Sequence, residues 1–120
     1  MKNVHLSVWT ENFTQSIEAS TMAKGSHHGE KFLFHKLQDS VAAMKKICSK
    51  IQEADDPSNF YNHLCIYIQE AKNCMYWYER SLDYEIVNLS NSQLILSQGK
   101  SMINVLESAL RVIKYQSTIN

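Results

Sequence analysis

The feature that most constrains the fold is a run of apolar residues spaced alternately three and four apart between residues 30 and 53. Its members are Phe34, Leu37, Val41, Met44, Cys48 and Ile51. This spacing keeps returning to one side of an α-helix, whereas a half-buried strand would alternate at every second residue. The segment is therefore predicted to be a long helix that packs lengthwise on other helices.

Three further segments show helical stripes and complete an expected set of four helices. The first covers about residues 6–24 and ends at the polar, glycine-containing run 25–29. Its stripe consists of Leu6, Trp9, Phe13 and Ile17. The third covers about residues 57–83, with a stripe of Phe60, Leu64, Tyr67 or Ile68, Ala71, Met75, Tyr78 and Leu82. The fourth begins near Asn91 or Ser92, with a stripe of Ile95, Met102, Leu106, Ala109 and Ile113.

Local signals support these boundaries. Asp56 is suited to cap the third helix, and Pro57 to occupy its first position. Gly99 lies inside the fourth stripe, where it costs about 1 kcal/mol of helix propensity but permits close approach of a neighbouring helix. With only three glycines and one proline, residues 1–120 are predicted to form one all-α domain, an antiparallel up-down-up-down four-helix bundle.

Composition excludes several classes of protein. The formal net charge is +0, so no overall field attracts nucleic acid or an anionic membrane. The three cysteines, Cys48, Cys65 and Cys74, form no Cys-x-x-Cys pair, which argues against a disulfide framework or a zinc knuckle. The first residues lack the apolar run of a signal peptide, and no stretch has the length of a membrane span, so a cytoplasmic location is expected.

No catalytic or metal-binding motif supports an enzyme. None of the glutamates has a histidine three residues later, as a di-iron bundle requires, and no two histidines have the spacing of a zinc hydrolase. There is no Gly-x-Ser-x-Gly elbow, and Gly99-Lys100-Ser101 lacks the earlier glycine of a phosphate-binding loop. Neither arginine precedes a histidine, which excludes a helical ribonuclease built on that order. We therefore expect no catalytic residue, metal or cofactor.

The two halves of the chain differ in charge. Residues 1–52 hold seven lysines against four acidic residues, a net charge of +3, and the remainder has a net charge of −3. Five lysines cover about half the circumference of the helix expected at residues 30–53, away from its apolar stripe. The hypothesis that they contact nucleic-acid phosphates names Lys31, Lys36, Lys45, Lys46 and Lys50. The alternatives are a solvated helix face and a surface for an acidic peptide.

The helix expected at residues 57–83 has more apolar surface than one core needs. Besides its main stripe it carries Tyr61, Cys65, Tyr76 and Trp77 around the cylinder. Because aromatic residues are enriched in interface cores, these four are predicted to form a subunit interface. The alternative is a central helix that contacts both neighbours within one small bundle.

Short motifs along the chain resemble those of a known family. Leu6-Ser7-Val8-Trp9 resembles a Leu-x-Val-Trp opening, and Lys50-Ile51-Gln52-Glu53-Ala54 stands where Asn-Ile-Ala-Glu-Gly is usual. Family positions for Phe, Leu and Ile follow, here occupied by Phe60, Leu64 and Ile66. The segment from Gly99 to Asn104 resembles a final-helix Gly-Lys/Arg-Met-Leu-Asn/Gly motif with one extra residue. The family is the four-helix bundle proteins encoded in intervening sequences of bacterial 23S ribosomal RNA genes, with the related accessory variability determinant proteins of diversity-generating retroelements.

This resemblance implies a function. Members form homopentameric, barrel-like assemblies, and the retroelement branch binds nucleic acid and its reverse transcriptase. The expectation is therefore a non-enzymatic, homo-oligomeric accessory protein that binds RNA or DNA, a reverse transcriptase, or both, as a scaffold. The alternative is a protein–protein interaction module without nucleic-acid binding.

Overall fold

The chain forms four α-helices, as its periodicity predicts. The computed structural model describes residues 4–21, 28–84 and 86–119, and that part of the chain contains no strand, only one isolated bridge between Thr21 and Val87. The helices are α1 (Val4–Ser20), α2 (His28–Glu53), α3 (Pro57–Asp83) and α4 (Ser92–Ile119), with a short 3₁₀ turn, η1 (Leu89–Asn91), before α4. The all-α class with four helices is thus confirmed.

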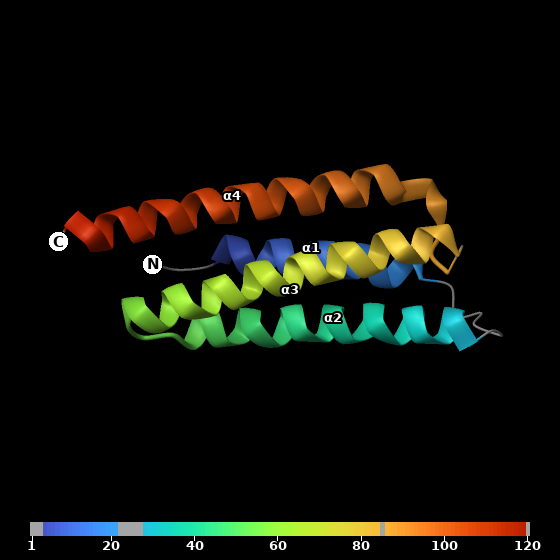
Figure 1. Cartoon of the computed structure of the whole chain (residues 1–120), viewed down its shortest axis with the longest axis horizontal. Helices are drawn as coiled ribbons and strands as arrows, with labels where there is room; N and C mark the ends of the chain where they lie inside the picture. The colour runs from blue at the N-terminus through green and yellow to red at the C-terminus, as the bar shows by residue number, and fades with distance from the viewer. Residues whose placement is uncertain (1–3, 22–27, 85, 120) are drawn as a thin grey trace.

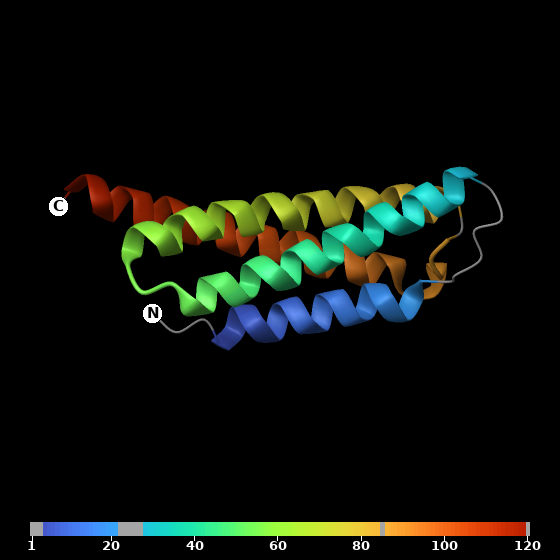
Figure 2. The same ribbon diagram turned by 90° about the horizontal axis from the view of Figure 1, so that it is seen from below.

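The helices lie side by side along the long axis of a molecule that measures 55 × 23 × 21 Å (Figures 1 and 2). Helix α3 packs against α2 and α4, and α1 also packs against α2 and α4. The α2–α3 face and the α1–α4 face therefore lie on opposite sides of the molecule. Helix α4 is the longest and projects beyond the other three at its C-terminal end (Figure 1).

The helix boundaries follow from local chemistry. The backbone N–H of Asn59 donates to the Asp56 carboxylate at 2.8 Å, and Pro57 occupies the first turn of α3, as predicted. Helix α1 ends at Ser20, whose carbonyl accepts a hydrogen bond from the Asn88 N–H at 2.6 Å. The predicted end at Lys24 lies outside the described residues. The predicted stop at residues 25–29 lies largely outside the described residues. Helix α2 begins two residues before the predicted start.

The predicted stripes form the core. Every member of the predicted α2 stripe from Leu37 to Ile51 is buried. The members of the predicted α3 stripe from Leu64 to Tyr78 are buried as well. The prediction was wrong for Trp9, whose side chain is exposed at the edge of the α1–α4 groove. Some buried residues were not predicted from the stripes. They include Leu33, Ile47 and Ile103 on the helices, and Ile86 and Val87 in the connection between α3 and α4.

Gly99 marks the closest approach of α4 to its neighbours. A Cβ atom at this position would clash with Sδ of Met75 on α3 and would lie 3.0 Å from Cε1 of Phe13 on α1. Both side chains are buried, so an added methyl group would require the flexible Met75 side chain to repack within the core. The predicted role of Gly99 in close helix approach agrees with this packing.

The substitution Gly99→Ala is expected to destabilise the protein. Overpacking costs about 1–3 kcal/mol and alanine gains roughly 1 kcal/mol of helix propensity, so a net destabilisation of up to about 2 kcal/mol is expected. Urea denaturation followed by circular dichroism measures the change. In a Met75→Ala background, where the clashing side chain is absent, the same substitution is expected to be neutral or stabilising. A stabilised single variant would contradict the close approach.

Candidate binding surfaces

The five lysines proposed to contact phosphates are all exposed on α2, but their surroundings differ. Lys31, Lys46 and Lys50 lie on the side of α2 that faces away from its buried stripe, and within the described residues they form no ion pair. Lys36 and Lys45 lie at the two edges of this face. The structure therefore places three of the five lysines on one open surface and engages the other two with neighbouring helices.

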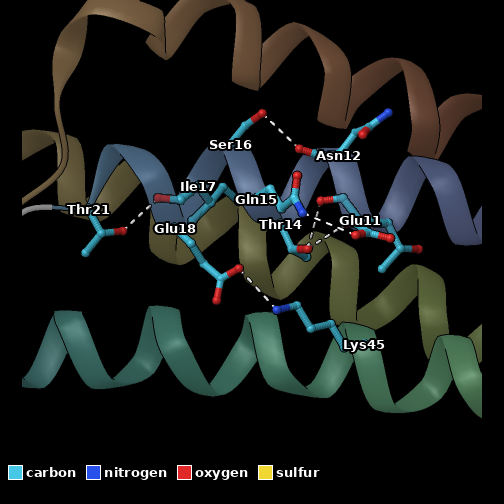
Figure 3. A network of polar contacts seen from close by, with 10 residues as sticks. Glu11, Asn12, Thr14, Gln15, Ser16, Ile17, Glu18, Thr21 and Lys45 are labelled. Carbon is cyan, nitrogen blue, oxygen red and sulfur yellow. Dashed lines mark hydrogen bonds and ion pairs between the residues drawn. The ribbon is translucent and has the colours of Figure 1, made fainter.

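Lys45 lies against α1. Its Nζ atom is 3.1 Å from Oε1 of Glu18, and Figure 3 shows the two side chains pointing toward each other across the gap between the helices. The surrounding groove, about 350 Å³, also contains the carboxylate of Glu11, together with several hydroxyl and amide groups. A phosphate bound here would lie close to two carboxylates, so Lys45 fits an interhelical ion pair better than a phosphate contact.

Lys36 lies against a group of aromatic rings. Its Nζ atom is 5.5 Å from the centre of the Phe32 ring and 5.8 Å from that of the Trp77 ring. The Phe32 and Trp77 ring centres are 5.9 Å apart, and Tyr76 packs edge-on against Trp77 at 4.9 Å. We call Phe32, Lys36, Tyr76 and Trp77 the aromatic–lysine cluster. Ammonium groups are attracted to aromatic faces at such distances.

Helix geometry explains why these four residues meet. Phe32 and Lys36 are four residues apart and share the α3-facing edge of α2, while Trp77 sits on the α2-facing edge of α3. Phe32 and Tyr76 each leave more than half of their surface exposed, whereas Trp77 is partly buried against the core. Lys36, Tyr76 and Trp77 were predicted from the sequence as functional residues, but Phe32 was not, although its spacing of four from Lys36 indicates that the two share a helix face.

The four residues predicted as a subunit interface do not share one face. On a helix with 3.6 residues per turn, Trp77 lies about 160° around the axis from Tyr61. Tyr61 and Cys65 are half-buried, and Trp77 packs beside α2. Tyr76 is the exposed member of the group. Tyr76 lies only about 60° around the axis from Tyr61, so it shares a side of α3 with Tyr61 and Cys65, while its ring also packs against that of Trp77.

Buried polar groups in the bundle are held in their neutral forms. The hydroxyls of Thr10 and Tyr67 are hydrogen-bonded at 2.5 Å, and Tyr67 Oη lies 3.6 Å from Met102 Sδ. Burial raises the pKa of Tyr67, and the Thr10 hydroxyl opposes this only in part. Burial likewise raises the pKa of the Cys74 thiol to about 11. Neither group ionises near neutral pH, so they join the helices rather than supply a nucleophile.

The described residues contain no cluster of three histidine, cysteine or acidic side chains able to hold a metal ion. None of the helices in that part of the chain combines the length and the hydropathy needed to cross a bilayer. Comparison of the chain with protein-family models, with curated proteins and with solved structures finds no match.

The raised pKa of Cys74 has a consequence for stability at high pH. The unfolded thiol, with a pKa near 9, loses its proton before the folded one, whose pKa is about 11. The contribution of the Cys74 thiol to the free energy of unfolding is therefore complete below pH 9. It is lost as the pH rises through 11, and the free energy of unfolding decreases by about 3 kcal/mol.

Comparison of wild type with Cys74→Ala isolates this effect. The stability advantage of the wild type, measured by urea denaturation, is expected to shrink between pH 9 and pH 11. The variant Met75→Leu removes no titratable group and is expected to keep a constant difference from wild type. A constant difference for Cys74→Ala as well would show that burial does not raise this pKa.

Proposed function

We propose that the protein is a non-enzymatic, self-associating accessory protein of the cytoplasm that binds nucleic acid as a scaffold. Its unit is an antiparallel up-down-up-down bundle, and its binding surface combines the open face of α2 with the aromatic–lysine cluster. The observation that carries this proposal is the position of the Lys36 ammonium group over both the Phe32 and Trp77 rings. This contact joins the N-terminal part of the basic face of α2 to the aromatic side chains of α3.

Such a region matches what a nucleic acid strand presents. Lysines neutralise phosphates regardless of sequence, and exposed aromatic rings offer faces on which bases stack, each contributing about 1–3 kcal/mol. Lys31, Lys46 and Lys50 would follow the backbone along α2, while Phe32 and Tyr76 would contact bases. Because none of these groups reads base edges in a fixed geometry, binding would depend little on sequence.

The family resemblance supports the same proposal and extends it. It implies a reverse transcriptase as a protein partner and an assembly of five copies. A scaffold that presents several basic surfaces would gain affinity through simultaneous contacts along one strand. A second candidate function is a protein-interaction module, because the half-exposed Phe32 and Tyr76 rings beside lysines also suit an acidic peptide with apolar side chains.

The double variant Lys46→Glu, Lys50→Glu tests the phosphate contacts. Fluorescence anisotropy of a structured RNA and of a matching RNA–DNA hybrid, at several salt concentrations, is expected to show at least tenfold weaker binding and a shallower salt dependence than wild type. The variant Lys72→Glu, Lys100→Glu makes the same change in net charge on the α3–α4 side and is expected to bind more tightly than the α2 variant. Equal affinities for the two variants would contradict a role for α2.

The aromatic rings need a separate test. In a Trp9→Phe background, Trp77 is the remaining tryptophan, and base stacking near it is expected to quench its fluorescence on addition of single-stranded RNA. Phe32→Ala is expected to weaken binding about tenfold, since it removes a stacking surface. Unchanged fluorescence together with unchanged affinity would remove the cluster from the nucleic-acid surface. Tight binding of acidic peptides in its place would support the second candidate.

A further inference from the structure

Two rings of the aromatic–lysine cluster remain open to solvent while a third holds them in place. Phe32 on α2 is 54% exposed and Tyr76 on α3 is 53% exposed. Each of these rings meets the partly buried Trp77 ring edge-on, with an angle of 80° between the ring planes. Trp77 packs against the core, so it restricts the motion of both exposed rings. The cluster therefore offers two flat, apolar surfaces that are already oriented.

Arg80 adds a second cation beside these rings. It lies four residues after Tyr76 and three after Trp77, so it shares their edge of α3, one turn toward the C-terminal end. The residue is exposed, and within the part of the chain that the structure describes it forms no ion pair. Tyr76 and Arg80 both line a shallow groove of about 380 Å³. A guanidinium group matches the geometry of a phosphate and also stacks on flat rings.

Carboxylates offset the charge of the two cations. Asp39 lies three residues after Lys36 on α2. Glu79 and Asp83 line the same groove as Arg80. Attraction of phosphates alone is therefore weak around the rings. A duplex presents mainly phosphates on its outside, because its base faces are covered by the stack and unstacking them costs energy at every step. An unpaired strand presents base faces as well, and these gain affinity from aromatic rings.

We infer that the aromatic–lysine cluster, extended by Arg80, binds unpaired nucleic acid strands in preference to duplexes. Bases stack on Phe32 and Tyr76, while Lys36 and Arg80 contact neighbouring phosphates. This inference rests on the nucleic-acid binding in the proposed function and goes beyond it by naming the form of the ligand and a further contact residue. A surface that acted through lysines alone would favour the duplex, which carries one charge per about 1.7 Å of its axis. The sign of the preference therefore shows whether rings or lysines select the ligand.

Fluorescence anisotropy of the full chain measures this preference, with a short unstructured RNA and the same RNA annealed to its complement at equal salt. The wild type is expected to bind the single strand at least about tenfold more tightly than the duplex. The double variant Phe32→Leu, Tyr76→Leu keeps apolar bulk but removes both stacking faces. It is expected to lose the preference with little change in duplex affinity. Trp9→Leu removes an exposed ring from the α1–α4 side and is expected to retain the preference.

Arg80→Gln tests the further contact. Loss of one phosphate contact to a single strand is expected to reduce the slope of log affinity against log salt by roughly 0.7. Arg111→Gln makes the same change in net charge on α4 and is expected to leave the slope unchanged. Thermal unfolding by circular dichroism confirms that each variant remains folded.

The outcomes separate this inference from the proposed function. A wild type that binds the duplex as tightly as the single strand, or more tightly, would overturn the inference and leave binding through the lysines standing. Equal losses of single-strand and duplex affinity in the ring variant would overturn it as well. An unchanged salt dependence for Arg80→Gln would remove Arg80 from the site. Absence of binding to either form would overturn both the inference and the nucleic-acid binding on which it rests.

Discussion

Burial of one side of α3 between α2 and α4 is the interaction on which the rest of the structure depends. The fully buried tyrosines Tyr67 and Tyr78 both belong to this side, together with Ala71 and Cys74. Complete burial of large apolar side chains contributes about 1.5–3 kcal/mol each, so this helix fixes the orientation of its neighbours. The absence of a side chain at Gly99 lets α4 approach Met75, and that approach determines which residues of α4 remain outside.

Once α3 is fixed, the bundle presents two faces of different chemistry on opposite sides. The α2–α3 side carries the aromatic–lysine cluster, and the α1–α4 side carries a groove lined by uncharged residues, Trp9, Leu94 and Val105 among them. A substitution on one side therefore need not disturb the other.

The sequence predicted the core and the helix ends wherever short-range rules decide the outcome. The alternation from Leu37 to Ile51 and the Asp56–Pro57 cap are such cases, because spacing and capping act within a few turns. The sites depend on how helices are rotated against each other, which spacing alone does not fix. The Glu18 carboxylate beside Lys45, and the Phe32 and Lys36 side chains beside Trp77, come from other helices, so spacing within one helix does not indicate them.

The central claim is that copies of the chain associate and that the surface formed by α2 and the aromatic–lysine cluster binds nucleic acid. The most direct test is the composition of the complex, measured by sedimentation velocity with separate signals for protein and fluorescent single-stranded RNA. Complexes in which several protein chains bind RNA are expected. Protein that stays monomeric, or that sediments apart from RNA even at low salt, would contradict the claim.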